Sequence, residues 1–282
     1  MLIDTHCHIQ FAAYKDDADV VIQKCVDADM LLNCVGSQLS TSQRAVEYAH
    51  KYPNIFATVG LHPVHLFATE VDEGEEVSFT SRAEVFDHAA YAVLAQDPKT
   101  IAIGECGLEL YHLPKNVDRE KLLQTQKETF LAQYNLAQEY NLPLVIHVRD
   151  AHSEMISLLK TLLAPINGVV HCYTGNWTEA QEYLALGLHI GFTGVVTFPP
   201  KKTDPKPQEE LLEVVRNVPP DRILIETDAP YLAPQAYRGE RCEPWMVREV
   251  AKKLATERNM TVEEVIAVTT ANAKRLFTTM VI

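Results

Sequence analysis

Short runs of apolar and β-branched residues recur along the chain, separated by longer stretches in which apolar residues follow helical spacing. The short runs are nearly continuous in hydrophobicity, as expected for parallel strands that are covered on both faces. Eight candidate strands can be placed in this way, at residues 2–4, 31–35, 55–59, 101–104, 144–146, 169–170, 189–192 and 223–225.

The intervening stretches predict helices. The longest covers residues 118–140 and stops before Asn141-Leu-Pro143. Other helix ends are indicated by two capping-box pairs and a terminating glycine, which are Ser81 with Glu84, Thr261 with Glu264, and Gly187. Strand and helix alternate about eight times without a linker, which predicts an α/β protein with a single TIM-type (β/α)8 barrel over residues 1–282. A doubly wound open sheet is the alternative.

The composition is that of an ordinary globular protein. Of the 282 residues, 47% are hydrophobic and 22% charged, which is enough to build a large core. We find no apolar run long enough for a membrane span and no basic, apolar leader at the start, so we expect a cytoplasmic protein with no membrane contact. The six cysteines form no C-x-x-C pair and are expected to be reduced thiols.

The net charge of −13 argues against a protein that coats nucleic acid, because such proteins are usually basic. It does not exclude an enzyme that meets phosphates through cations and a few local basic side chains. Two loops stand out, the acidic residues 70–76 and the basic, proline-rich residues 199–207, and both are interpreted as solvated surface.

Metal-capable side chains follow five of the predicted strands. The first strand ends in His6-Cys-His8, and residues two apart in extended chain project to the same face. A single H-x-H is a weak signal. The weight comes from its recurrence at other strand ends, where the residues are Glu105, His147, His171 and Asp228. In a barrel these ends lie on the face where active sites are built.

The residue types point to hydrolysis. Imidazole and carboxylate ligands suit zinc, manganese, iron or nickel, and magnesium less well. Four histidines and two carboxylates exceed one tetrahedral zinc site but suit two divalent cations, with one carboxylate bridging them. Such a pair can activate water. We therefore expect two divalent cations, with zinc, magnesium and manganese as the candidates.

Longer motifs surround these residues. In these motifs the chain resembles the TatD family of metal-dependent DNases, from residue 3 to Thr269-Thr-Ala-Asn-Ala273 and Arg275-Leu-Phe277. The motifs that carry the resemblance are His6-Cys-His8, Gly60-Leu-His-Pro63, Gly104-Glu-Cys-Gly-Leu108, His147-Val-Arg-Asp-Ala151, His171-Cys-Tyr-Thr-Gly175 and Glu226-Thr-Asp-Ala-Pro-Tyr-Leu232.

This resemblance implies a (β/α)8 barrel and cleavage of DNA as substrate, often from an end, with no obligate protein partner evident. Transferred by motif, His6 and His8 with Asp228 would hold one cation. His147 and His171 would hold the second, Glu105 would bridge the two, and Asp228 would also orient or deprotonate the attacking water. The chain departs from the usual family pattern at Glu109, where Asp is common, which leaves any positioning role of this residue open.

Four further residues are candidates for substrate contact, namely His62, Arg149, Arg238 and Arg241. Arg149 could pair with phosphate in a bidentate way or form a structural ion pair. Arg238 and Arg241 could form a basic lip together with Lys201, Lys202 and Lys206. The remaining residues near the motifs are expected at the surface or in packing: His65, His112 and His152 as surface histidines, and Cys106 and Cys172 in the layer between strands and helices.

Two other functions are compatible with the same metal ligands. A metal-dependent hydrolase of another ester or amide, such as one that deacylates D-aminoacyl-tRNA, would use the same ligands. A bridging lysine from the fourth strand, which is common in related amide-cleaving barrels, is absent, and this favours the nuclease. A scaffold that had lost turnover should lose ligands first, and all six are present.

Overall fold

The structure is a computed structural model that describes residues 1–72, 78–114, 117–162 and 165–280. Its main sheet has eight strands in the order β1-β2-β3-β6-β7-β8-β9-β10, and every pairing is parallel. The strands are β1 (Leu2–Cys7), β2 (Met30–Val35), β3 (Ile55–Val59), β6 (Thr100–Glu109), β7 (Leu144–Arg149), β8 (Gly168–Val170), β9 (His189–Phe192) and β10 (Ile223–Ile225).

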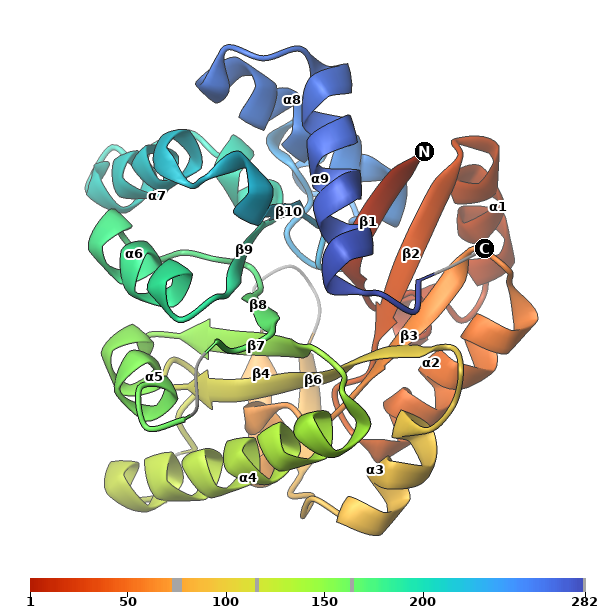
Figure 1. Ribbon diagram of the computed structural model, residues 1–282, viewed down its shortest axis with the longest axis vertical. Helices are drawn as coiled ribbons and strands as arrows, with labels where there is room; N and C mark the ends of the chain where they lie inside the picture. Colours follow the sequence, from red (N-terminus) through yellow and green to blue (C-terminus); the bar gives the residue numbers. More distant parts are fainter. Residues whose placement is uncertain (73–77, 115–116, 163–164, 281–282) are drawn as a thin grey trace.

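Helices follow the strands and form an outer layer around them (Figure 1). They are α1 (Ala18–Asp27), α2 (Leu39–Lys51), α3 (His88–Ala95), α4 (Arg119–Tyr140), α5 (His152–Leu159), α6 (Trp177–Ala185), α7 (Lys206–Asn217), α8 (Val247–Arg258) and α9 (Val262–Leu276). Short 3-10 helices occur at Ala12–Tyr14, Pro63–Leu66, Gly194–Thr197, Pro220–Arg222, Gln235–Tyr237 and Pro244–Met246. The predicted (β/α)8 barrel is confirmed. Neighbouring barrel strands follow one another along the chain, whereas a doubly wound sheet would reverse its strand order.

The barrel is nearly closed, and its seam between β1 and β10 is held by few backbone bonds. Asp228 N donates to His6 O at 2.9 Å and His8 N to Ala229 O at 2.7 Å. Buried Asp4 adds a side-chain link, because its carboxylate accepts hydrogen bonds from Thr227 N (2.9 Å) and Thr227 Oγ1 (2.6 Å). The seam therefore brings the ends of the first and last barrel strands together.

Local signals explain most helix ends. The Asp118 side chain accepts from the backbone N–H groups at the start of α4, and Asn141 ends that helix in the left-handed conformation. The capping box at Thr261 and Glu264 starts α9 as predicted. Gly187, with φ +100°, follows α6 in the role of a helix terminator. These predictions are confirmed.

The capping box predicted at Ser81 and Glu84 is wrong. Ser81 lies in a strand of a two-stranded antiparallel hairpin, β4 (Ala68–Asp72) with β5 (Ser78–Arg82), where it pairs with Thr69. Glu84 instead accepts from Leu39 N at the start of α2, at 3.0 Å. Helix α3 begins later, after Asp87, whose side chain caps Ala90 N. Most of the acidic 70–76 stretch lies outside the described residues, which resume at 78.

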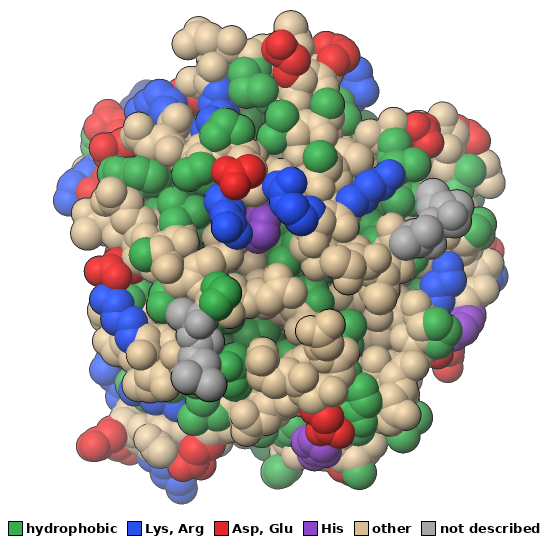
Figure 2. All heavy atoms as spheres, in the orientation of Figure 1, with side chains coloured by type: hydrophobic (Ala, Val, Ile, Leu, Met, Phe, Trp, Pro, Cys, Tyr) green, Lys and Arg blue, Asp and Glu red, His purple; other side chains and the backbone are tan. Residues whose placement is uncertain are grey.

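An apolar cluster fills the amino-terminal end of the barrel. Residues near the starts of the strands, among them Ile3, Phe56 and Leu224, are buried together with Phe277 just beyond α9. Figure 1 shows α9 in dark blue beside β1 and β10. On the face where α9 lies, acidic and basic side chains are interspersed (Figure 2). In the part of the chain that the structure describes, no helix is both long and apolar enough to cross a membrane.

Candidate metal centre

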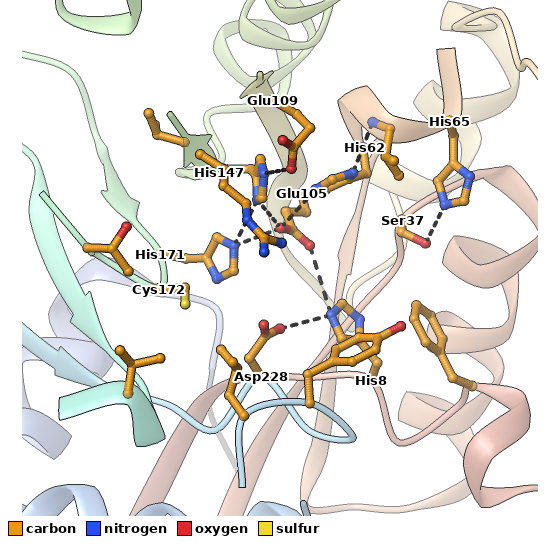
Figure 3. Close-up of a pocket in the computed structure, with 18 residues that line it drawn as sticks. His8, Ser37, His62, His65, Glu105, Glu109, His147, His171, Cys172 and Asp228 are labelled. Carbon is orange, nitrogen blue, oxygen red and sulfur yellow. Dashed lines mark hydrogen bonds and ion pairs between the residues drawn. The ribbon is translucent and has the colours of Figure 1, made fainter. Parts of the chain in front are cut away.

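A cleft of about 250 Å³ opens at the carboxyl ends of the barrel strands. Five of the six predicted ligands line it, and the sixth, His6, lies fully buried directly beneath, with its Nε2 3.3 Å from His8 Nε2. Figure 3 shows His8, His147 and His171 pointing toward Glu105, with Asp228 beside His8. The fold therefore brings together all six residues that the strand-end pattern selected, although they span more than 220 positions of the chain.

The Glu105 carboxylate, 4% exposed, lies between two groups of histidines. Its Oε1 is 2.9 Å from His147 Nδ1 and 2.7 Å from His171 Nε2. Its Oε2 faces the other side, 3.4 Å from His6 Nε2 and 3.9 Å from His8 Nε2. Each carboxylate oxygen thus faces a different pair of imidazoles, which is the arrangement that a bridging ligand requires.

Asp228 completes the group around His6 and His8. Its Oδ1 is 3.2 Å from His8 Nε2 and 3.6 Å from His6 Nε2. Ligand atoms of these three residues all lie within 4.8 Å of one another, as do those of His6, Glu105 and His171. Both groups are compact enough to surround a cation.

Hydrogen bonds on the outer side of the rings orient the imidazoles. His8 Nδ1 is 2.7 Å from Val35 O, a pure acceptor, so the proton of neutral His8 lies on Nδ1 and the Nε2 lone pair faces the site. His147 Nε2 is likewise 3.2 Å from Glu109 Oε2. His171 Nδ1 makes no hydrogen bond within the described part of the chain, but the Glu226 carboxylate lies 3.6 Å from it. Metal-binding histidines have such outer acceptors, so the donor set fits a pair of divalent cations.

The pKa values show what the cluster does when only protons are present. Burial lowers the pKa of His147, but hydrogen bonds to Glu105 and Glu109 outweigh it and raise the pKa to about 9. Burial also opposes the charge on His171, whose pKa the Glu105 carboxylate raises well above the usual value. Burial raises the pKa of Glu105, yet the surrounding histidines hold it well below its usual range. Protons and cations therefore compete for the same nitrogens.

His62 lines the cleft as well, and its Nε2 is 3.4 Å from Glu105 Oε1. It differs from the other histidines because its Nδ1 accepts a hydrogen bond from Val64 N at 3.1 Å. The proton of neutral His62 must then lie on Nε2, and burial lowers its pKa, which favours this neutral form. Although His62, Glu105 and His147 form a third compact group, the hydrogen bonding makes His62 a donor toward the site.

The three arginines that were candidates for substrate contact lie in different surroundings. Arg149 lines the cleft, with its guanidinium 4.1 Å from the centre of the Tyr111 ring. Arg238 is exposed and lies over the Phe198 ring at 4.4 Å, and the cleft lining does not include it. Arg241 is outside the lining too and forms two hydrogen bonds to Asp17, at 2.9 and 2.6 Å.

Several predictions about neighbouring residues are wrong. Cys172 lines the cleft, because it follows the end of β8 with φ +44° and the alternation of an extended strand no longer applies. His65 is buried and also lines the cleft, while His112 and His152 are only partly exposed. Cys106 is buried with its Sγ 3.8 Å from Val145 O, as expected for a packing residue. All six cysteines are free thiols.

Sequence reasoning left the role of Glu109 open and did not predict that Glu109 and Glu226 contact the ligands. Strand β6 continues to Glu109, five residues beyond its predicted end, so Glu105 and Glu109 lie on one face by alternation. Glu226, fully buried after β10, contacts His171 and accepts a hydrogen bond from Cys172 N at 2.6 Å. The apolar walls of the cleft are formed by Phe11, Val64, Val148, Val195, Tyr231 and Leu232. The sequence offered one signal for Glu109 and Glu226, since each is a carboxylate within four positions of a predicted ligand and next to a buried strand.

Taken together, the fold and the cleft define a (β/α)8-barrel protein with a histidine and carboxylate centre suited to divalent cations. Residues 3–278 match the family model for TatD related DNase, and the chain belongs to this family.

The similar proteins cover the whole length of the chain. It is 39% identical over 279 residues to an uncharacterized metal-dependent hydrolase, YabD, from Bacillus subtilis strain 168, covering 98% of this chain and 99% of that one. It is 33% identical to the 3'-5' ssDNA/RNA exonuclease TatD of Citrobacter rodentium strain ICC168, covering 98% and 97%. The structure of YjjV, a TatD homologue from Escherichia coli K12, superposes with a TM-score of 0.80 at 25% identity, covering 98% of both chains.

Proposed function

We propose that this protein is a metal-dependent deoxyribonuclease that hydrolyses phosphodiester bonds from an end of a DNA strand. The observation that carries the proposal is the Glu105 carboxylate, which lies between two histidine pairs with one oxygen facing each. The family membership and a relative named for 3'-5' exonuclease action on single strands support the choice of substrate.

We assign the ligands as the sequence predicted. His6, His8 and Asp228 would hold one divalent cation, His147 and His171 would hold the other, and Glu105 would bridge them. When bound, the two cations would lower the pKa of a water molecule and neutralise charge on the phosphate. Zinc, manganese and magnesium remain the candidates, and imidazole nitrogens favour the first two.

We assign to Asp228 the role of orienting or deprotonating the attacking water. Its side chain is 15% exposed, more than that of Glu105, so part of the carboxylate faces the cleft. Burial raises the pKa of Asp228, but the hydrogen bond from His8 and the neighbouring histidines lower it overall, so the group is ionised at neutral pH. An ionised carboxylate at this position can accept a proton from water or orient it.

We assign contacts with the nucleic acid to three side chains of the cleft. His62 presents an N–H on the same side of the site as His147, where it can donate to a phosphate oxygen. Arg149 at the cleft wall can pair with a phosphate. Tyr231, half-buried in the cleft wall, offers a ring against which a base can stack. A cleft of this size suits a single strand better than an intact duplex.

The test is a cleavage panel with purified protein that has been stripped of metal and then reloaded. End-labelled single-stranded and double-stranded DNA, RNA, D-aminoacyl-tRNA and a small ester are incubated with zinc, manganese or magnesium. We expect stepwise shortening of single-stranded DNA that EDTA abolishes and that Glu105→Ala lacks. Inertness toward every nucleic acid, with turnover of an ester or amide, would replace the proposed substrate.

A further inference from the structure

Glu109, at the end of β6, is 1% exposed and receives hydrogen bonds from two directions. Its Oε1 accepts from Tyr111 N at 2.6 Å and from His112 N at 3.0 Å. Its Oε2 lies 3.2 Å from His147 Nε2 and 3.4 Å from His112 Nδ1. Burying a carboxylate is costly unless hydrogen-bond donors surround it. The Glu109 carboxylate accepts hydrogen bonds both from the loop that follows β6 and from His147.

On the histidine side, Glu109 determines which nitrogen of His147 faces the centre. Nδ1 of the ring faces Glu105 Oε1 and His171 Nε2, at 2.9 and 3.4 Å. A carboxylate is an acceptor only, so when a cation replaces the proton on Nδ1, Glu109 keeps the other His147 proton on Nε2. Figure 3 shows Glu109 and Glu105 on opposite sides of the His147 ring. The outer carboxylate therefore presents a lone pair toward the cation position.

On the loop side, Glu109 holds the residues that follow β6. The Tyr111 ring, 57% exposed, lies under the Arg149 guanidinium at 4.1 Å, and Leu110 N donates to Arg149 O at 2.9 Å. Arg149 lines the cleft. Two hydrogen bonds to Glu109 Oε1 thus hold an aromatic ring against a cationic side chain at the cleft wall.

We propose that Glu109 is a positioning residue that couples the metal centre to the substrate-binding wall, fixing His147 through one oxygen and the Tyr111–Arg149 stack through the other. The two oxygens of one carboxylate therefore contact both the histidine and the loop. The substrate-binding half of this proposal rests on the proposed nuclease function. The metal-binding half does not.

The two halves can be separated because glutamine has one acceptor and one donor end. In Glu109→Gln, the amide oxygen can still accept from Tyr111 N and His112 N. The amide nitrogen then faces His147 Nε2 and cannot accept its proton, so the His147 ring must move or present N–H toward the cation position. In Tyr111→Ala the carboxylate keeps His147, and only the stacked support of Arg149 is lost.

The experiment uses cobalt(II) as the probe, titrated into metal-free protein while visible absorption and bound cobalt are measured. Wild type and the control Glu128→Gln, an exposed position on α4, should bind two cobalt ions. In Glu109→Gln we expect one site to weaken by about 10- to 100-fold, the size of effect seen when an outer-shell partner is lost. Tyr111→Ala should bind cobalt like wild type.

Kinetics on single-stranded DNA test the other half. Tyr111→Ala should raise KM about 5- to 10-fold with little change in kcat, because phosphate contacts act mainly on binding. Glu109→Gln should lower kcat, with KM within about twofold of the wild-type value.

Two tight cobalt sites in a folded Glu109→Gln would overturn the metal half. An unchanged KM in Tyr111→Ala would overturn the coupling. If wild type fails to cleave DNA while the cobalt results hold, the nuclease assignment fails and the positioning of His147 stands.

If Glu109→Gln does not fold, Glu109→Asp gives the same test, and thermal melting of the metal-free protein identifies which variants fold. The shorter side chain should weaken either the His147 contact or the loop contacts. We therefore expect either a weakened cobalt site or a raised KM. Wild-type values for both would overturn the proposal.

Discussion

The two ends of the barrel use the same strands in opposite ways. At the amino-terminal end, inward-facing residues such as Ile3, Phe56 and Leu224 are buried against Phe277 beyond α9. At the carboxyl-terminal end, the same strands carry buried histidines and carboxylates that face one another. Burying these ionisable side chains without bound cations is unfavourable. The apolar side chains at the other end stabilise the fold through packing. The difference shows that stability and chemistry are separated along the length of each strand.

The strongest test of this separation is the removal of the bridge. Glu105→Ala should reduce DNA cleavage by about 10³-fold or more, because both cation positions lose a shared ligand. The melting temperature of the metal-free protein should fall at neutral pH, because His147 and His171 lose the carboxylate that balances their charge. Elemental analysis should count fewer than two cations per chain. Full cleavage by this variant would remove Glu105 from the bridging position.

At the other end, Phe277→Ala should show the reverse behaviour. Deleting this fully buried ring leaves a cavity and should cost about 3–5 kcal/mol of the free energy of unfolding. Denaturant unfolding measures the loss, and kcat on DNA at a temperature where the variant remains folded should match wild type. A large fall in kcat in the folded variant would mean that the two ends are energetically coupled.

Protons provide a third way to sharpen the comparison. Because its partners raise the pKa of His147 to about 9 in the absence of a cation, His147 stabilises the metal-free fold below its unfolded pKa of about 6.5. That contribution is lost as pH rises through about 9. The melting temperature of metal-free protein should therefore fall between these pH values, and the reloaded protein should not show this decline.

The same competition predicts proton release on metal binding. At pH 7.5, adding zinc should release at least one proton per chain, measured by calorimetry in buffers of different ionisation enthalpy. Glu109→Gln should release fewer protons, since it removes one carboxylate that holds His147 protonated. Cation binding without proton release in wild type would contradict this description of the centre.

The smallest expected effect is the difference in KM between variants of Arg149 and Arg241. Arg149→Ala should raise KM for single-stranded DNA by about tenfold, since a charge-assisted contact at the cleft wall is lost. Arg241→Ala should leave KM unchanged and lower stability by at most about 1 kcal/mol, because its partner Asp17 lies at the surface. A raised KM in Arg241→Ala would restore it as a substrate contact.

Much of this molecule could be predicted from the sequence. All eight barrel strands were located from apolar runs, and residues such as Glu105 and His147 were selected because they follow those runs. This worked because parallel strands buried on both faces need continuous hydrophobicity, and because barrel geometry places their carboxyl ends together. Helix ends with side-chain caps, such as the one at Asp118, can be predicted because the capping signal lies within a few neighbouring residues.

Other features were decided by tertiary structure alone. Ser81 and Glu84 have the spacing of a capping box, but pairing with β4 places Ser81 in a strand and frees Glu84 to cap α2. The cleft-facing position of Cys172 follows from its positive φ, which no strand pattern predicts. Arg241 follows the last barrel strand like a rim residue, yet Asp17, 224 positions earlier, binds it.

By itself, therefore, the sequence determined the order of the strands, the chemistry at their ends and the family. Only the tertiary structure decided which oxygen of Glu105 faces which histidine pair, and which nitrogen of each imidazole faces the centre. The physical reason is that hydrophobic pattern acts over a few neighbouring residues, whereas hydrogen bonds such as those between His8 and Val35 and between His147 and Glu109 depend on positions that the whole fold sets.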